Sequence, residues 1–279
     1  MLCSYCSTPL AVEKAYNEKV IAPKSILPFK LDRKTARDKF NKWLKNLVLA
    51  PDSLKKAVLD VDHFKGVYIP YWTFDTDTFS KYVGKRGVNY TATESYTTTV
   101  HGESVTKERR VVLTDWYPAH GEVRKFFNDI LVPATGSLPQ EYITALEPWD
   151  LENLVLFDKS YLTGYTAEKY QIKLAEGFEI AKVIADAGIR SLACKDIGGD
   201  DQQITSLDSE FNSITFKHVL LPVYVSAYKY KGKLYQFIIN ARTGEVHGDR
   251  PWNWIKIVVA ALIILVIIGS LLVFEYMHK

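Results

Sequence analysis

The stretch GVYIPYWTF, residues 66–74, carries the clearest structural signal in the chain. It is rich in aromatic residues and isoleucine, which favour strands, and Pro70 within it is typical of an edge or bulged strand. A similar stretch, HVLLPVYVS at 218–226, occurs far along the chain. The likeness reflects either an ancient duplication or chance between two aromatic strands. Aromatic β-structure is therefore expected in two separate parts of the sequence.

The region after the first stretch also predicts strands. Residues 78–100 and 108–127 alternate polar residues with aromatic or β-branched ones. Gly84 and Gly87 are typical turn residues within the first of these segments. A β-rich region with turns at these glycines is therefore expected.

The second aromatic stretch lies in a longer β-rich region, 216–251. Three strand-like runs there are separated by Lys231-Gly232 and by Thr243-Gly244. Both dipeptides are reasonable hairpin turns, so we expect antiparallel strands in this region.

A basic amphipathic helix is predicted within residues 24–65. Pro51 should end this helix, and 53–59 predicts a short second one. The basic residues form either a solvated face above a core stripe, which we favour, or a face that lies on an anionic membrane. The apolar residues that recur at helical spacing are Ala36, Phe40, Trp43, Leu44 and Leu47.

The middle of the chain predicts further helices. A proline opens a helix over 148–157, and Thr166 is the expected N-cap of a longer one over 167–188, closed by its last residue, a glycine. The Gly- and Asp-rich segment 195–209 predicts a surface loop. Together with the β regions, this pattern predicts an α+β fold of mixed, aromatic-rich antiparallel sheets with packed helices.

The C-terminal tail predicts a single transmembrane helix. Residues 257–274, IVVAALIILVIIGSLLVF, contain no charged side chain, and Trp252, Trp254 and Tyr276 flank them like an aromatic belt. More Lys and Arg precede this segment than follow it, which predicts a tail-anchored, single-pass protein of the cell inner membrane with a cytoplasmic N-terminal domain. The lipid bilayer is thus one expected partner.

The charge balance bears on the other partners. The net charge of +3 over 279 residues leaves the part before Trp252 nearly neutral. Non-specific nucleic-acid binding depends on a clear basic excess, so nucleic acid is not the expected principal partner. Instead, 17 Tyr, 13 Phe and 6 Trp suit sheet packing and also the docking of a protein partner.

Two cysteines form half of a candidate zinc site. Cys3 and Cys6 are spaced as C-x-x-C, the shape of one zinc-ribbon knuckle, whereas a full site needs four ligands. A second pair of cysteines upstream of this start, or two chains sharing one ion in a dimer, would complete it. The alternative is a pair of exposed thiols, and Cys194 is too distant in sequence to be assumed as a ligand.

No common catalytic motif is present, and we expect no enzymatic activity. The sequence contains no P-loop, Rossmann fingerprint, H-E-x-x-H or G-x-S-x-G. Its six histidines have no ligand spacing. Four carboxylates near aromatic strands are either an acid/base pair or ordinary turn residues, and we favour the second: Asp75, Asp77, Asp115 and Asp129.

An ordered series of segments resembles a known bacterial family. The series runs through GVYIPYWTFD, YVGKRGVNY, WYPAHG, FFNDILVPAT, LEPWDL, YLTGYTAEKY and the strands of 219–251. It resembles the TFIIB-type zinc-ribbon-containing proteins, whose relatives often carry a primosomal N′ or replication factor Y helicase label. The resemblance covers about residues 1–255.

The resemblance implies an N-terminal zinc ribbon of two knuckles, a mixed α+β domain and, in some members, a membrane helix. Cys3 and Cys6 match the second knuckle, and the first is missing. The helicase label lacks its ATP-binding motif here. Some relatives look like accessory proteins of phage-shock or SPFH type membrane-stress systems, which implies a partner of that kind.

These observations predict three parts: a partial zinc-ribbon knuckle at 1–23, an α+β cytoplasmic domain at 24–250 and a transmembrane anchor at 251–279. The expected function is a non-enzymatic, membrane-anchored scaffold or adaptor that binds a protein partner. The alternative is a nucleic-acid-binding accessory protein that uses the zinc ribbon and the basic region 24–65.

Overall fold

The computed structural model describes residues 20–57, 64–100 and 103–277, and Cys3 and Cys6 lie outside these ranges. The described residues belong to two compact units. Unit 1 takes those of Met1–Tyr71, Pro133–Ile172 and His218–Lys279, and unit 2 takes those of Trp72–Val132 and Lys173–Lys217. The predicted division at residues 23 and 250 stays a prediction.

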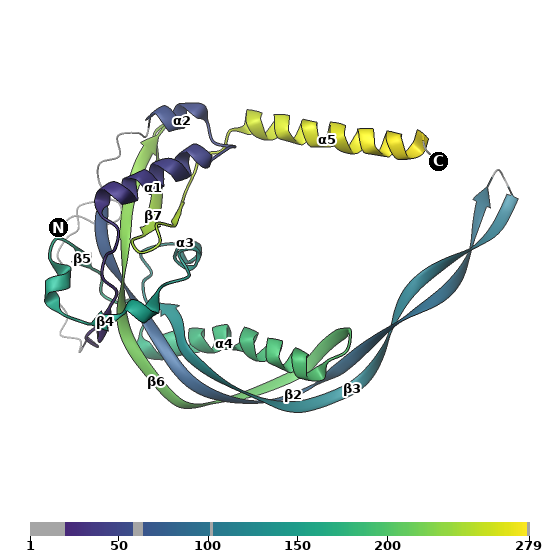
Figure 1. Ribbon diagram of the computed structural model, residues 1–279, viewed down its shortest axis with the longest axis horizontal. Helices are drawn as coiled ribbons and strands as arrows, with labels where there is room; N and C mark the ends of the chain where they lie inside the picture. Colours follow the sequence, from purple (N-terminus) through teal and green to yellow (C-terminus); the bar gives the residue numbers. More distant parts are fainter. Residues whose placement is uncertain (1–19, 58–63, 101–102, 278–279) are drawn as a thin grey trace. The chain divides into compact units, whose positions relative to one another are not determined.

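Helices and strands form a mixed α+β fold, as predicted (Figure 1). In chain order the elements are β1 (Ser25–Ile26), α1 (Arg33–Asn46), α2 (Asp52–Ala57), β2 (Lys65–Val100), β3 (Glu103–Pro133), α3 (Gln140–Ala145), the 3-10 helix η1 (Leu151–Asn153), β4 (Val155–Leu156), the 3-10 helix η2 (Lys159–Leu162), β5 (Thr166–Ala167), α4 (Leu174–Ile197), β6 (Asp201–Tyr230), β7 (Lys233–Asn240), β8 (Val246–Gly248) and α5 (Trp254–Met277).

The strands belong to one sheet with the order β3-β2-β6-β1-β4. β7 pairs antiparallel with β6, and β8 with β7, around the predicted turn at Lys231 and Gly232, both of which have positive φ. However, β1 runs parallel to β6 and β5 parallel to β2, so the strands form one mixed sheet where mixed antiparallel sheets were predicted. Short connections cannot produce such parallel pairs, and here the partners come from distant parts of the sequence.

Strand β2 is an inner strand, not the edge strand that Pro70 suggested. It lies between β3 and β6. Pro70 keeps its carbonyl, which accepts a hydrogen bond of 2.9 Å from the Ala134 amide. A proline lacks the backbone N–H donor but keeps the carbonyl acceptor. A strand therefore tolerates proline at a position where only the carbonyl is hydrogen-bonded.

Gly84 and Gly87 do not form turns, because β2 continues through both. A Cβ on Gly84 would lie 2.2 Å from the carbonyl oxygen of Gln203 on β6. This glycine therefore permits two backbones to approach closely, which is the other common role of glycine within a strand.

In unit 1, α1 packs on β6 and β7 as its apolar pattern predicted. Ala36, Phe40 and Leu44 are buried, and the Phe40 ring stacks on Phe237 at 3.9 Å between centroids. Asp32 caps the helix by accepting a hydrogen bond of 2.7 Å from the Thr35 amide. The end near Pro51 and the short α2 agree with the prediction.

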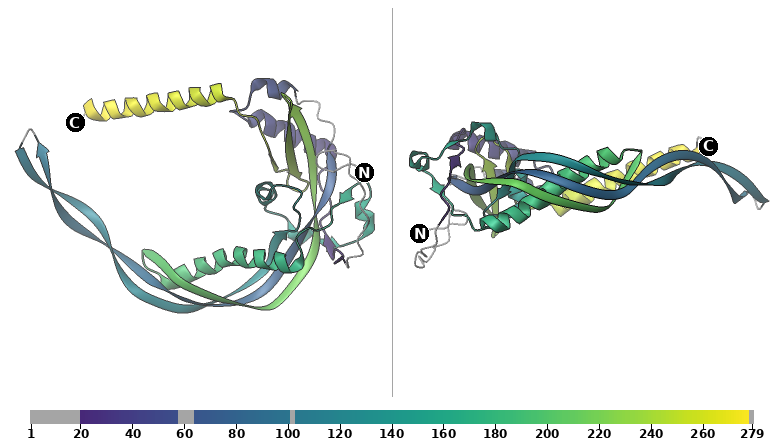
Figure 2. Two further views of the ribbon diagram at one scale, coloured as in Figure 1. Left: turned by 180° about the vertical axis from the view of Figure 1, so that it is seen from behind. Right: turned by 90° about the horizontal axis from the view of Figure 1, so that it is seen from below.

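In unit 2, α4 runs along the strands (Figure 2). Four of the six residues of its buried face are glycine or alanine, which lets the helix lie close to the strands. A Cβ on Gly177 would lie 2.7 Å from the Trp72 indole, and one on Gly188 3.1 Å from the Phe127 ring. The buried residues of this face are Gly177, Ala181, Ala185, Ile189, Ala193 and Ile197.

Four predictions in the middle of the chain were wrong. Residues 148–157 form only a 3-10 turn and a short strand, and Thr166 lies in β5 instead of capping α4. Gly188 lies inside α4, which continues to Ile197 and is closed by Gly198 with φ +67°. The predicted loop 195–209 shrinks to a tight connection because α4 and β6 each extend into it. Packing of a helix on neighbouring strands can extend it past a residue of low helix propensity, as at Gly188.

The last element, α5, is long and apolar enough to cross a membrane. Its 24 residues span about 36 Å, compared with about 30 Å for the hydrocarbon core of a bilayer. None of its candidate spanning segment, Trp254–Tyr276, is buried against the described chain.

Candidate functional site: the distal ribbon

The far part of β2 and the near part of β3 form a two-stranded ribbon that we call the distal ribbon, residues 90–100 and 103–113. β6 begins at Asp201, next to the Asp200 amide that donates to the Gly87 carbonyl at 2.9 Å. Beyond that point, the described sheet consists of β2 and β3 alone (Figure 1). The ribbon therefore has no third strand or helix on which to pack within the described part of the chain.

Side-chain contacts establish the antiparallel register of the ribbon. Thr114 Oγ1 donates to Asn89 Oδ1 at 2.7 Å, and further out Arg109 Nη2 donates to Glu94 Oε2 at 2.8 Å. The Arg109 guanidinium also lies 5.6 Å from the centre of the Tyr96 ring. These pairs cross between the strands and leave both outer backbone edges uncovered in the described chain.

Both faces of the ribbon are exposed as well. Consecutive residues of a strand point to opposite faces, and yet Val112 and Leu113 are 68% and 44% exposed. Tyr90, Tyr96 and Val105 are exposed further along the ribbon, and Tyr117 at its base. A strand pair that buries neither face gains little hydrophobic stabilisation of its own.

The ribbon is electrically neutral. Residues 90–113 carry three basic side chains and three acidic ones. A nucleic-acid-binding arm depends on a basic excess that releases counterions, and the ribbon has none. Its chemistry suits a polypeptide partner that adds strands or apolar contacts.

An open cavity of about 610 Å³ lies at the base of the ribbon. Tyr117, His120 and Arg86 contribute to its lining. There the Tyr82 hydroxyl donates to Asp196 Oδ2 at 2.6 Å, and burial, followed by this hydrogen bond and the carboxylate charge, raises the pKa of Tyr82 to about 12. The tyrosine is therefore a protonated donor at neutral pH and not a base.

The structure brings together two of the four carboxylates that were candidates for acid/base chemistry. Asp75 Oδ1 accepts from the Asp129 amide at 2.8 Å, and Lys217 Nζ lies 3.1 Å from Asp129 and 3.7 Å from Asp75. Burial opposes the charge on Lys217, but hydrogen bonds and charges of the two carboxylates outweigh it and raise the lysine pKa. This is an ion-pair cluster. Asp77 and Asp115 lie apart from it.

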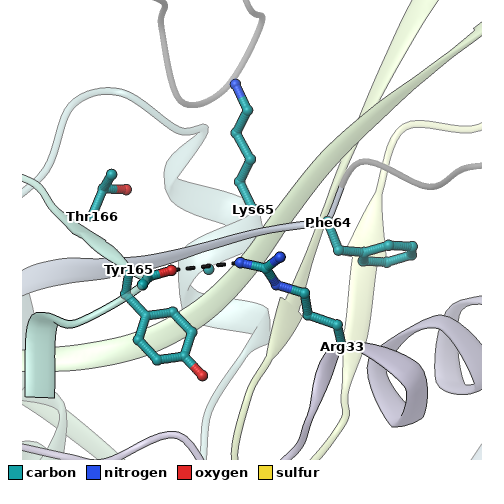
Figure 3. A pocket seen from close by; sticks show the side chains of 7 residues that line it. Arg33, Phe64, Lys65, Tyr165 and Thr166 are labelled. Atoms are coloured by element: carbon teal, nitrogen blue, oxygen red, sulfur yellow. Dashed lines mark hydrogen bonds between the residues drawn. The ribbon is translucent and has the colours of Figure 1, made fainter.

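A smaller cavity of about 320 Å³ lies in unit 1 between α1, the start of β2 and the residues before β5 (Figure 3). Arg33 Nη2 donates to the Gly164 carbonyl at 3.5 Å. Figure 3 shows Lys65 extending away from the Arg33 guanidinium, so the two cations do not converge on one point. The cavity therefore lacks the geometry of an anion site.

Metal-ligand residues do not cluster in the part of the chain that the structure describes. No group of three or more His, Cys, Asp or Glu side chains there has the arrangement of a metal site. Cys194 is a partly buried free thiol on α4. His218 is buried, its Nδ1 lies 2.8 Å from the Ile21 carbonyl, and burial lowers the pKa of this histidine. The zinc prediction for Cys3 and Cys6 stays a prediction.

Sequence reasoning did not single out the distal ribbon as a site. It predicted strands over 78–100 and 108–127 and interpreted Gly84 and Gly87 as turn residues within the first of these segments. The signal available was the length of the alternating pattern, because two strands of 36 and 31 residues exceed ordinary strand lengths several-fold.

Comparisons with known proteins give one distant relative. The chain is 28% identical over 235 residues to the uncharacterized protein YdjG of Bacillus subtilis, a match that covers 83% of this chain and 64% of YdjG. The chain thus spans less than two thirds of that relative's length. No family model matches the sequence, and no solved structure matches the chain.

Proposed function

We propose that this protein is a non-enzymatic scaffold or adaptor that is anchored in the bacterial inner membrane by α5 and binds a protein partner through the distal ribbon. The observation that carries the proposal is the ribbon itself. It is a pair of strands with two uncovered edges and two exposed faces. An isolated two-stranded hairpin is at best marginally stable in water, so a partner that covers it would stabilise it.

The edges of the ribbon favour a partner that adds a strand. Unpaired strand edges present rows of N–H and C=O groups, and an extended peptide can satisfy them by β-augmentation. Exposed Val112, Leu113 and Tyr117 supply apolar side chains beside these edges. A partner of phage-shock or SPFH type, as the family resemblance implies, is our proposal for its identity.

The composition of α5 and its flanks supports the anchor. Trp252 and Trp254 are 48% and 75% exposed at its start, and Tyr276 is 83% exposed near its end. Amphipathic aromatic rings favour the membrane–water interface at both ends of a span. The basic residues before α5 favour a cytoplasmic location for the rest of the chain.

Zinc binding at Cys3 and Cys6 is a separate part of the proposal. A site completed by two chains would make the protein a dimer that holds one ion. Metal analysis of the purified protein tests this, with Cys3→Ser and Cys6→Ser together expected to remove the zinc and Cys194→Ser expected to retain it. A metal content that is equal in the three proteins would contradict it.

The scaffold role is tested by site-specific photo-crosslinking in membranes. A photoreactive amino acid in place of Tyr96 or Val112 should crosslink to a defined protein, whereas the same group in place of Val183, which is 73% exposed on α4, should not. The crosslinked protein is then purified and its binding to the full chain is measured directly.

A shortened variant provides the matching loss of function. Asn89 and Thr114 face each other across the strands, so an Asn-Gly turn can replace residues 90–113 without disturbing the rest of β2 and β3. This variant should incorporate into membranes and lose the partner. Full binding by the variant would refute the role of the ribbon, and steeply salt-dependent DNA or RNA binding by the wild type would favour the nucleic-acid alternative.

A further inference from the structure

A basic cavity lies beside the first turn of α5, in unit 1. Its volume is about 390 Å³. The β6–β7 hairpin supplies one side and the segment that leads into α5 supplies the other. Its lining consists of Pro51, Tyr230, Lys231, Lys233, Tyr235, Arg250, Pro251, Trp252 and Trp254.

The lining carries three cations and no carboxylate. Within the described chain, no carboxylate lies within ion-pair distance of Lys231, Lys233 or Arg250. The nearest carboxylates along the chain are engaged elsewhere, because Asp52 pairs with Lys256 at 2.7 Å and Asp249 accepts from the Tyr142 hydroxyl. The lining of the cavity therefore carries a net positive charge.

The aromatic residues arrange these cations for a negatively charged group. The Arg250 guanidinium lies 4.3 Å from the centre of the Trp252 ring. A guanidinium stacked on an indole keeps its N–H groups free at the edge, where they can bind a phosphate in bidentate fashion. Lys231 and Lys233, which flank Gly232 in the β6–β7 hairpin turn, line the same cavity as Arg250.

The start of α5 is held firmly against unit 1. The Asn253 amide donates to the Leu49 carbonyl at 2.9 Å, and Asn253 Oδ1 accepts from the Ile255 amide at 3.0 Å as a helix cap. Lys256 Nζ donates to the Ala50 carbonyl at 3.1 Å. These contacts join the wall of the cavity to the first turn of the candidate membrane span, and lipid headgroups lie at the ends of such spans.

We infer that this cavity binds the phosphate of an anionic phospholipid headgroup. The inference rests on the proposed membrane anchor. Lys231, Lys233 and Arg250 would bind the phosphate, and the exposed indole of Trp254 would lie at the boundary with the acyl chains. Charge complementarity selects an anionic lipid over a zwitterionic one, because three cations without a carboxylate favour net negative charge.

The test uses the full chain reconstituted into phosphatidylcholine vesicles that contain a minor fraction of phosphatidylglycerol. Tryptophan fluorescence is measured with bromine-labelled acyl chains on one lipid or on the other, in equal amounts. Brominated phosphatidylglycerol should quench the wild type more strongly than brominated phosphatidylcholine. Substitution of Trp252 and Trp254 by Phe identifies the signal of these two indoles.

Substitutions in the cavity should remove the preference. Lys231→Gln, Lys233→Gln and Arg250→Gln should each reduce it by about fivefold, the effect of one basic side chain at an anionic surface. The combined cavity variant, which carries all three substitutions, should show no preference. The matched control is the combined replacement of Lys24, Lys34 and Lys159 by Gln, which removes the same charge from exposed positions of unit 1 outside the lining. The control should keep the wild-type preference.

The outcomes separate this inference from the membrane anchor. A chain that does not incorporate into neutral vesicles contradicts the anchor. A chain that incorporates but is quenched equally by both lipids overturns the headgroup site. Loss of the preference in the control variant, or its survival in the combined cavity variant, also overturns the assignment. Abolition of the preference by inorganic phosphate would overturn it as well, because that result would identify a site for free phosphate.

Discussion

The two halves of strand β2 have similar composition and opposite environments. Tyr68, Tyr71 and Trp72 are almost fully buried near its start, whereas Tyr90 and Tyr96 are 44% and 41% exposed in the distal ribbon. Both halves are aromatic and threonine-rich, and both are strand. The comparison shows that strand propensity decides the backbone conformation, while neighbouring elements decide what the strand contributes to stability.

Neighbours account for the difference. The buried half has strands on both sides and helices or loops on its faces, and Gly177 of α4 packs directly on Trp72. The distal ribbon, by contrast, has only β3 beside it within the described chain. Apolar burial stabilises by about 25 cal/mol per Å², so the first half contributes most of the stability and the second half remains available for binding.

The largest expected effect comes from the aromatic residues. Trp72→Ala should lower the free energy of unfolding by about 3–5 kcal/mol, since it leaves a large cavity under α4. Tyr96→Ala, the matched change in the ribbon, should alter it by less than about 0.5 kcal/mol. Urea unfolding of the full chain in micelles, followed by circular dichroism, measures both. Equal decreases in the free energy of unfolding for the two variants would contradict the contrast between the two halves of β2.

Two arginine–carboxylate pairs extend the comparison to charges. The Arg242 side chain is 11% exposed and binds Asp150 through Nε at 3.0 Å, with a further hydrogen bond of 3.1 Å from Nη1 to the Pro28 carbonyl. Arg242→Met should lower the free energy of unfolding by about 1.5–3 kcal/mol because the Asp150 charge and the carbonyl lose their donor. The same urea experiment measures the change in the free energy of unfolding. A smaller change than Arg109→Met causes at the exposed pair of the distal ribbon would contradict the prediction.

The Asp150 pair also predicts a pH dependence. Hydrogen bonds from Arg242, which outweigh burial, hold the pKa of Asp150 below its usual 3.8. A carboxyl whose folded pKa is lowered stabilises the fold above its unfolded pKa, and this stabilisation is lost as pH falls through the folded value. As the pH falls below 3.8, the free energy of unfolding of the wild type should therefore decrease. Asp150→Asn lacks the carboxylate and should show a smaller decrease over the same range. Thermal unfolding from pH 7 to acid measures the difference, and parallel curves would refute the assignment.

The smallest effect is expected at the exposed pair of the distal ribbon. The side chains of Arg109 and Glu94 are 60% and 52% exposed, although they lie 2.8 Å apart. Arg109→Met should lower the free energy of unfolding by less than about 1 kcal/mol, and salt should abolish the difference. A large, salt-resistant loss would show that the ribbon is stabilised by its own contacts.

Local patterns predicted the elements whose packing follows from their own sequence. The stripe of Ala36, Phe40 and Leu44 produced α1, and the Lys231-Gly232 turn produced the β6–β7 hairpin. The boundaries of α4 could not be predicted in this way. Gly188 looked like a helix end, whereas in the structure it lies close to the Phe127 ring, and a contact between residues so far apart in sequence leaves no local pattern.

The sequence by itself determined the α+β class and the apolar C-terminal helix, because hydrophobic periodicity and an uninterrupted apolar run are local properties. Only the tertiary structure decided that Gly84 belongs to a continuous strand, that Asp75 and Asp129 meet at Lys217, and that β6 begins opposite Gly87. That last feature leaves the distal ribbon without a third strand. The residue at which β6 joins the sheet depends on which segments pair, although they are far apart in the sequence. Such pairing produces no periodic pattern within either segment, so the sequence does not predict it.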